Sequence, residues 1–368
     1  MTFRLLIIGG YGNFGQHICR RLHRESGITL IIAGRNIDKA QAFAKTLTPT
    51  HPIETETIDI HKNLSEALSH IKPDLVIHTS GPYQGQDYHV ARACIKQGCH
   101  YIDLADAREF VASIDVLDAA AKENNCLIIS GASSVPCLTS ALIDHYSPMF
   151  KEVTQAYYGI STTQKNNRGQ ATTEAILSYT GHAFNTVSDG KNTQIYGWQG
   201  LKRRSFWKLG KRWLSDCDIP DLTLFRQRYP NLQTIEFKAG LEISILHLGL
   251  WALSYLRRWR LLPRLDRFAP AMMYIANFFD RFGSEKSGFY MRLSGTDFEN
   301  SPKTIEFDLV ARSGHGPFIP AMPAVILAKK LAQKQIKERG ATACMGLVTR
   351  DEYLDILADL DIEWKETL

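Results

Sequence analysis

The feature that most constrains this chain is a glycine-rich turn between a predicted strand and a predicted helix. Residues 3–8 (FRLLII) form a short apolar run, which predicts a buried parallel strand. The turn GYGNFG follows at residues 10–15, and residues 16–24 then carry apolar side chains at helical spacing. A second apolar strand is predicted over residues 29–33. The pattern therefore predicts a β-α-β unit of a dinucleotide-binding sheet.

The glycines of such a turn have separate tasks. They allow a tight turn, a close approach of the backbone to a pyrophosphate, and close packing of the helix on the strand. The pyrophosphate is expected at the helix N-terminus, where free N–H groups and the helix dipole favour an anion. The alternative is a turn that merely joins a strand to a helix. The residues predicted to contact the cofactor here are Gly9, Gly10, Gly12, Asn13, Phe14 and Gly15.

The residue after the second strand distinguishes NAD from NADP. NAD-binding units carry an acid there, which accepts from the ribose 2′-OH, whereas an arginine accommodates the 2′-phosphate. Arg35 stands 20 residues after Gly15, Asn36 follows it, and no acid occupies residues 33–37. A guanidinium forks onto a phosphate that a carboxylate would repel. This pattern favours NADP, with a solvated charge at a strand end as the alternative for Arg35.

Further cofactor contacts are predicted at strand ends, because ligands of an open α/β sheet lie beyond the carboxyl ends of its strands. Asp59 ends a predicted strand over residues 53–60, and either reaches the adenine edge or caps the next helix. Ser80, Gly81 and Pro82 follow the fourth predicted strand. They are expected to border the nicotinamide ribose, unless they form only a turn.

Hydride transfer to a carbonyl or imine requires a nearby proton donor. Tyr83 follows the strand-four loop, and Asp103 lies at the exit of the fifth predicted strand. These two are the predicted catalytic residues, with His89 ranked behind them, although a tyrosine beside Gly-Pro can simply pack. Cys137 has no identifiable histidine partner and is not taken as a nucleophile.

Several of these segments resemble the saccharopine dehydrogenase (saccharopine reductase) family, and most closely its saccharopine dehydrogenase-like oxidoreductase branch. The resemblance spans nearly the whole chain and is weakest over residues 165–300. It rests on residues 9–15, 33–36, 80–83, 94–103, 130–136, 316–320 and 337–341. It implies an NADP-binding Rossmann domain, an inserted second α/β domain and a homodimer, but it implies no particular substrate.

The predicted fold class is α/β. A doubly wound parallel Rossmann sheet is expected over residues 1–134, followed by a second α/β domain with a mixed sheet over residues 135–315. Helices over residues 316–368 are expected to pack back on the Rossmann domain. A chain of 368 residues suits two such domains.

Residues 241–282 are unusual. They form two apolar stretches flanked by Arg and Trp, the composition of a segment lying in the plane of a membrane surface. The alternatives are a buried helix pair or a dimer interface with snorkelling arginines, since neither stretch is long enough to span a bilayer. The wider region 200–270 carries 14 Lys and Arg against 6 Asp and Glu.

Other classes of function receive less support. The seven cysteines form an odd set without a C-x-x-C pair, which predicts reduced thiols and a cytoplasmic chain, with membrane association left open. The twelve histidines are scattered and contain no H-E-x-x-H, so no metal site is predicted. The basic run 202–212 belongs to no known nucleic-acid-binding motif, and no nucleic-acid partner is expected.

The function predicted from the sequence is therefore an NADP-dependent oxidoreductase acting on a small carbonyl or imine compound. The alternative of a different class is a non-catalytic or sensing NADP-binding protein that docks on a membrane or partner through residues 200–283. True saccharopine formation ranks below a generic reductase, because the sequence reveals no convincing arginine pair for two substrate carboxylates.

Overall fold

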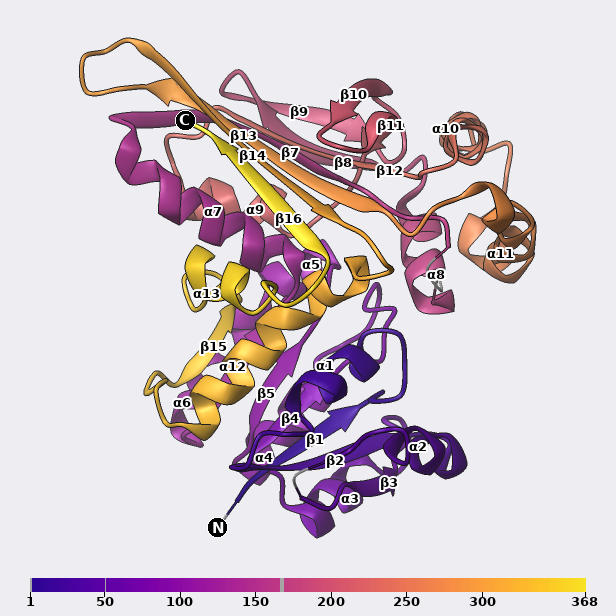
Figure 1. Ribbon diagram of the computed structural model, residues 1–368, viewed down its shortest axis with the longest axis vertical. Coiled ribbons are helices and arrows are strands. Elements are labelled where there is room, and N and C mark those ends of the chain that lie inside the picture. Colours follow the sequence, from indigo (N-terminus) through magenta and orange to yellow (C-terminus); the bar gives the residue numbers. More distant parts are fainter. Residues whose placement is uncertain (1, 50, 166–168) are drawn as a thin grey trace. The chain divides into compact units, whose positions relative to one another are not determined.

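The computed structural model describes residues 2–49, 51–165 and 169–368 (Figure 1). It divides into two compact units. The first unit combines Met1–Leu138 with Pro317–Ile356, and the second combines Thr139–Gly316 with Leu357–Leu368. Each unit contains its own seven-stranded sheet.

The first unit is the predicted doubly wound parallel sheet. Its strand order is β15-β6-β5-β4-β1-β2-β3, and every neighbouring pair is parallel. The order reverses between β1 and β4, which creates the switch point where such sheets bind ligands. The strands are β1 Phe3–Ile8, β2 Ile28–Gly34, β3 Glu54–Thr57, β4 Leu75–His78, β5 His100–Asp103, β6 Leu127–Ser130 and β15 Gly340–Ala343.

Helices complete the first unit, and two of their ends carry ordinary terminating residues. α4 stops at Gly98, whose φ of 70° suits a helix C-terminus, and Thr349 caps α13 through a capping box with Glu352. The segment after β5 forms two short helices, which are separated by a 3-10 turn over Ile114–Leu117. The helices are α1 Gly15–Leu22, α2 Ile37–Ala44, α3 Leu64–Ile71, α4 His89–Gln97, α5 Arg108–Ala112, α6 Asp118–Glu123, α12 Met322–Ala332 and α13 Arg350–Asp355.

The second unit has a mixed sheet, as predicted, in the order β10-β11-β12-β7-β13-β14-β16. Only the β12–β7 pair is parallel. Tyr158 of β7 packs on Phe225 of α9, so alternate residues of the strand, such as Tyr157, lie on the opposite face. The strands are β7 Glu152–Ser161, β8 Ala183–Ser188, β9 Lys191–Tyr196, β10 Lys202–Phe206, β11 Gly210–Asp216, β12 Thr234–Gly240, β13 Ser287–Thr296, β14 Pro302–Ala311 and β16 Ile362–Thr367.

The remaining elements of the second unit are helices and a small hairpin. β8 and β9 pair with each other outside the main sheet. The helices are α7 Thr139–Tyr146, α8 Gln170–Tyr179, α9 Asp221–Arg228, α10 Ser244–Arg258 and α11 Ala269–Phe278. In Figure 1, α10 and α11 lie at the same end of this unit.

The C-terminal region differs from the predicted set of helices. α12 ends at Ala332, and the chain then adds β15 to the first sheet beside β6. After α13 the chain enters the second unit, where β16 pairs antiparallel with β14. The sequence of β16, IEWKET, places charged side chains on the last strand of a sheet, where they discourage pairing with another chain.

Three further properties concern the cysteines, the helices and the metal-binding side chains of the described residues. All seven cysteines are buried, and no disulfide joins them. None of the helices in this part of the chain is both long and apolar enough to cross a membrane. Within the same residues, no group of three or more His, Cys, Asp or Glu side chains is placed to hold a metal ion.

Asp221 at the start of α9 gives the second unit a pH-dependent stability. Its side chain is fully buried, accepts a hydrogen bond from Thr139 Oγ1 at 2.7 Å, and has a pKa raised to about 7 by burial. The folded protein therefore keeps a proton that the unfolded chain releases near its ordinary pKa of 3.8. The resulting stabilisation is complete below that pKa and is lost as pH rises through about 7.

We expect the free energy of unfolding to fall between about pH 5 and pH 7, with a contribution from Asp221 of up to about 1.4 kcal/mol per pH unit. In Asp221→Asn the amide still accepts from Thr139, and this part of the slope should disappear. Urea unfolding across this range measures the slope, and Asp189→Asn, an exposed aspartate, is the control. Equal slopes in Asp221→Asn and the original chain would contradict the assignment.

Candidate active site

The glycine turn connects β1 to α1 at the switch point of the first sheet. Gly9 has a φ of 83°, and its carbonyl accepts from Gly12 N–H at 2.8 Å. α1 begins at Gly15 without a side-chain cap. In the described residues, the backbone N–H groups of Phe14 and Gly15 form no hydrogen bond. These donors at a helix N-terminus match the requirements of a phosphate group.

Arg35 follows the last residue of β2 beside this turn. Its side chain is exposed and forms no hydrogen bond or ion pair with the other described residues. Asn36, the next residue, accepts from Lys39 N–H through Oδ1 at 2.9 Å and caps α2. Its own N–H donates to Tyr11 Oη at 3.0 Å, which ties the end of β2 to the glycine turn. The guanidinium therefore remains available for an anionic ligand.

The loop after β4 lies directly against the glycine turn. Thr79 Oγ1 donates to the carbonyls of Ile8 and Gly9 at 3.0 and 3.1 Å. The side-chain amide of Gln86 donates to the carbonyls of Ser80 and Pro82 at 3.0 and 2.7 Å, which fixes the loop that contains Gly81. The structure thus brings together the glycine turn, the end of β2 and the Ser80–Gly81–Pro82 loop.

Asp59, beyond the end of β3, takes part in a local turn. Its Oδ1 accepts from His61 N–H at 3.1 Å, and its own N–H donates to Asn63 Oδ1 at 2.9 Å. The hydrogen bond from His61 is the main reason that the pKa of Asp59 is lowered. The Asp59 carboxylate thus stabilises the turn before α3 and does not cap that helix, whose N-cap is Asn63. Its predicted contact with adenine stays a prediction.

Tyr83 is turned into the first unit. Only 5% of the residue is exposed, and its hydroxyl donates to the His78 carbonyl at 2.6 Å. The ring packs against Phe110 and against the His78 ring, with centroids 5.5 and 5.4 Å apart. Burial raises its pKa well above the ordinary value. These contacts favour a packing role over the predicted role of proton donor.

Asp103 is also buried, at the last position of β5. Its Oδ1 accepts from the N–H groups of Ala105 and Gly131 at 3.0 and 2.8 Å and from Ser130 Oγ at 2.9 Å. Burial nevertheless raises its pKa to about 6. The carboxyl group therefore joins the ends of β5 and β6. Asp103 positions these two strand ends and does not reach a substrate.

His78 was not identified from the sequence, although it shares this buried cluster. It ends β4, pairs in register with Asp103, and has Nδ1 3.2 Å from Tyr101 Oη. Desolvation lowers its pKa to about 3, so the ring is neutral. Its position at a strand end was the available signal, but burial shows that the residue supports the loops instead of facing solvent.

Two other polar groups remain at this edge. His89, at the start of α4, has Nδ1 2.5 Å from Asp87 Oδ1, so its ring is already hydrogen-bonded to a neighbouring side chain. Asp106, in the loop after β5, is exposed, and its Oδ1 accepts from Gln84 Nε2 at 3.2 Å. Of the two acids at the exit of β5, Asp106 is therefore the one that solvent and small molecules can reach.

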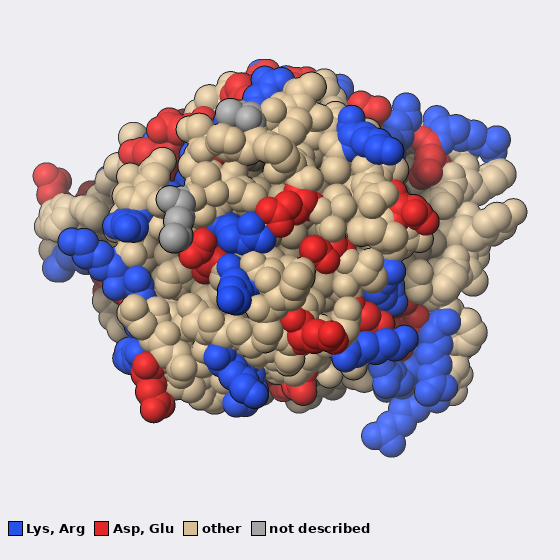
Figure 2. Space-filling view, turned by 90° about the horizontal axis from the view of Figure 1, so that it is seen from below, with Lys and Arg blue, Asp and Glu red and all other residues tan. Residues whose placement is uncertain are grey.

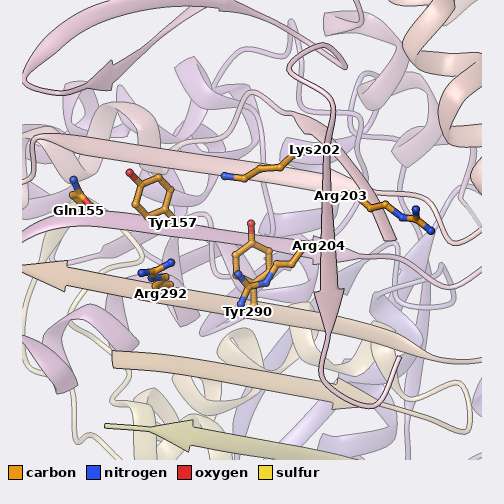
Figure 3. A pocket seen from close by; sticks show the side chains of 7 residues that line it. All are labelled: Gln155, Tyr157, Lys202, Arg203, Arg204, Tyr290 and Arg292. Carbon is orange, nitrogen blue, oxygen red and sulfur yellow. The ribbon is translucent and has the colours of Figure 1, made fainter. Parts of the chain in front are cut away.

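The second unit contains a cavity of about 410 Å³ on its sheet (Figure 3). Arg204 stacks on the ring of Tyr290, with its Cζ 3.8 Å from the centroid, while Arg203 points away from the other lining side chains. Arg292 of β13 lies opposite Tyr157 of β7 in the register. The residues lining the cavity are Gln155, Tyr157, Lys202, Arg203, Arg204, Tyr290 and Arg292.

This lining contains four cations and no carboxylate, which suits an acidic ligand. Lys202 Nζ forms an ion pair with Glu236 Oε1 at 3.0 Å. Arg204 forms no hydrogen bond with the described residues. Arg204 and Arg292 are a pair of the kind that the sequence did not reveal. They lie 88 positions apart, on β10 and β13, two strands that do not pair with each other, so no local motif indicates them. Arg292 Nε also lies 3.8 Å from Glu306 Oε1.

Comparison with known proteins agrees with this arrangement. Residues 5–129 match the model of the saccharopine dehydrogenase NADP binding domain. NADP is therefore the cofactor of the first unit, and the glycine turn with Arg35 is the part of this unit that suits it. No curated protein sequence matches the chain.

Solved structures show the fold. The apo histidine-tagged saccharopine dehydrogenase (L-Glu forming) from Saccharomyces cerevisiae is similar with a TM-score of 0.70, 13% sequence identity and 100% of both chains covered. An amine dehydrogenase from Mycobacterium smegmatis has a TM-score of 0.47 and 10% identity, covering 94% of this chain and 95% of its own. At 13% identity, the likeness to the saccharopine dehydrogenase establishes the α/β fold rather than an activity.

Proposed function

We propose that this chain, whose first domain belongs to the saccharopine dehydrogenase NADP-binding family, is an oxidoreductase that transfers a hydride to or from a small carbonyl or imine compound. The observation that carries the proposal is the NADP-type domain match, together with the glycine turn and the unpaired Arg35 at the switch point. When bound, NADPH supplies the hydride, and the protein has to orient the acceptor and supply a proton.

We assign the proton transfer to Asp106 in place of the buried Tyr83 and Asp103. Hydride addition to the carbonyl or imine carbon leaves electrons on oxygen or nitrogen, and a carboxyl group supplies the proton that this atom takes. Asp106 is exposed beside the loop that contains Gln84, whereas Asp103 already accepts three hydrogen bonds. Asp103 then acts as a positioning residue for the loop after β6.

The test is a screen that follows NADPH oxidation and NADP reduction with acidic and neutral carbonyl and amine compounds. Once a substrate is found, Asp106→Asn should lower kcat about 100-fold while NADPH still raises the melting temperature as before. Tyr83→Phe, which removes a hydroxyl already bonded to His78, should retain activity within a few-fold. Turnover unchanged in Asp106→Asn would reject this residue as the proton donor.

The same screen examines the cavity of the second unit. If an acidic compound is bound there, Arg204→Ala and Arg292→Ala should remove the increase in melting temperature that the compound produces. Arg203→Ala is the matched control, because that side chain points away from the others (Figure 3). No turnover with any compound, with cofactor binding intact, would favour the alternative of a non-catalytic NADP-binding protein.

A further inference from the structure

The second unit exposes an unusual concentration of large apolar side chains. Of twelve such exposed side chains among the described residues, nine fall within residues 245–282. Single exposed apolar residues are normal, but a concentrated set marks an interaction surface. We call it the 245–282 surface, and its members are Ile245, Leu256, Trp259, Leu261, Phe268, Tyr274, Ile275, Phe278 and Phe282.

α10 leaves part of its apolar surface exposed. Ile245, Leu256 and Trp259 recur at helical spacing on its exposed side, and Trp259 is 63% exposed. The buried side instead holds Leu250 and two polar residues. One of these, His247, is satisfied by Ser215 Oγ at 3.0 Å and by Leu241 N–H at 3.3 Å. The ordinary amphipathic helix would place its apolar stripe toward the core.

α11 continues the same surface. Ala269 is its only buried residue. Tyr274, Ile275 and Phe278 lie at the i, i+1 and i+4 positions of one face, and Tyr274 is 82% exposed. Phe282 follows one turn later and is 63% exposed. The buried-helix alternative for this segment is therefore wrong for the chain by itself.

Arginines surround the apolar side chains. Residues 244–282 contain six Arg against two Asp, a net charge of +4. Arg260 and Arg267 are exposed and form no ion pair with the described residues. Arg281 stacks on Phe278 and Phe282, with Cζ 4.3 and 4.7 Å from the ring centroids. In Figure 2, the right-hand edge, where α11 lies in Figure 1, shows mostly tan side chains with blue ones above and below them.

We propose that the 245–282 surface docks on an anionic lipid bilayer, with its aromatic side chains in the interface and its arginines at the headgroups. An in-plane segment of this kind combines exposed Trp, Phe and Leu with Arg, and the Arg stems lie along apolar surface while their charges stay in water. Anionic lipids complement the local charge of +4. A second copy of the chain does not, because a two-fold contact would bring this charge against itself.

The buried cysteines make a direct test possible. Tyr274→Cys places one exposed thiol on the surface, while the seven native cysteines are buried and react slowly. The thiol is labelled with an environment-sensitive NBD dye. Adding phosphatidylcholine vesicles with about 30% phosphatidylserine should shift its emission to the blue and raise it several-fold. Phe298→Cys, an exposed aromatic outside the surface, should show no change.

Flotation of the full chain then separates the apolar and charged contributions. Trp259→Ser with Phe278→Ser and Phe282→Ser should lower the bound fraction about tenfold, without a change in melting temperature, since these side chains are exposed. Arg260→Glu with Arg267→Glu should lower it similarly at about 0.1 M salt. Phe298→Ser is the control and should bind like the unaltered chain.

Failure of the unaltered chain to float with anionic vesicles at any salt concentration would overturn the proposal. A stable dimer that becomes a monomer in the Trp259, Phe278 and Phe282 variant, without vesicle binding, would assign the surface to a second copy. Equal binding to pure phosphatidylcholine would remove the requirement for anionic lipid. None of these outcomes depends on hydride transfer, so they can be distinguished from failure of the proposed activity.

Discussion

Arg35→Asp is expected to reverse the cofactor preference of the chain. The guanidinium at the end of β2 is exposed and forms no ion pair or hydrogen bond with the described residues. Its N–H groups can therefore donate two hydrogen bonds to the 2′-phosphate of NADPH. A hydrogen bond to a charged group contributes about 1.5–3 kcal/mol, which corresponds to roughly 10- to 150-fold in affinity. The aspartate repels the phosphate and accepts from the 2′-OH of NADH.

The measurement is the rise in melting temperature produced by NADPH and by NADH in the two proteins. The original chain should be stabilised more by NADPH, and Arg35→Asp more by NADH. Lys96→Asp makes a similar charge change in the last turn of α4, which lies at the amino ends of the strands, and should keep the original order. Equal stabilisation of the original chain by both cofactors would refute the role given to Arg35.

The elements of the first unit were largely predictable because their signals are local. β1, β4 and β6 are short runs of Leu, Ile and Val that a parallel sheet buries on both faces, and helices separate them. The 3-10 turn that separates α5 from α6 was not predictable, since Ser113, where α5 ends, is neither Gly nor Pro. Tertiary packing decides whether such a segment stays straight.

The second unit was harder to predict for a physical reason. β11, with the sequence GKRWLSD, and β16, with IEWKET, are rich in charge. β11 forms a hairpin with β10, but its second partner β12 and the partner of β16, β14, lie farther away in the sequence. A strand of this composition is defined by its neighbours in the sheet and has little pattern of its own. The cavity was missed for a related reason, because Arg204 of β10 and Arg292 of β13 come from strands that are not neighbours in the sheet.

The site shows the same division between local and non-local signals. The glycine turn and Arg35 follow from a motif, and the structure brings them beside the Gly81 loop. Tyr83 and Asp103 were chosen because they lie near strand ends, but hydrogen bonds to His78 and Gly131 turn them inward. Position along a strand locates the edge of the sheet, whereas the direction of a side chain depends on partners that the sequence does not specify.

Gly15→Ala is expected to destabilise the first unit more than a Gly→Ala substitution at any other glycine of the turn. A Cβ at Gly15 would lie 2.3 Å from the Gly9 carbonyl oxygen and 2.7 Å from Gly10 Cα, both backbone atoms. They cannot move aside without shifting the turn away from β2, because Gly9 N–H donates to the carbonyl of Ala33 in β2 at 2.8 Å. Overpacking against a rigid neighbour costs about 3 kcal/mol.

Thermal unfolding and NADPH binding measure the two consequences together. The melting temperature of Gly15→Ala should fall by roughly 10 °C, and NADPH should no longer raise it, because the N–H groups at the start of α1 are displaced. Gly27→Ala, whose Cβ would have no heavy atom within 4 Å, adds the same methyl group and should change neither quantity. A Gly15→Ala protein with unaltered stability and NADPH binding would show that the turn does not require close contact between α1 and β1.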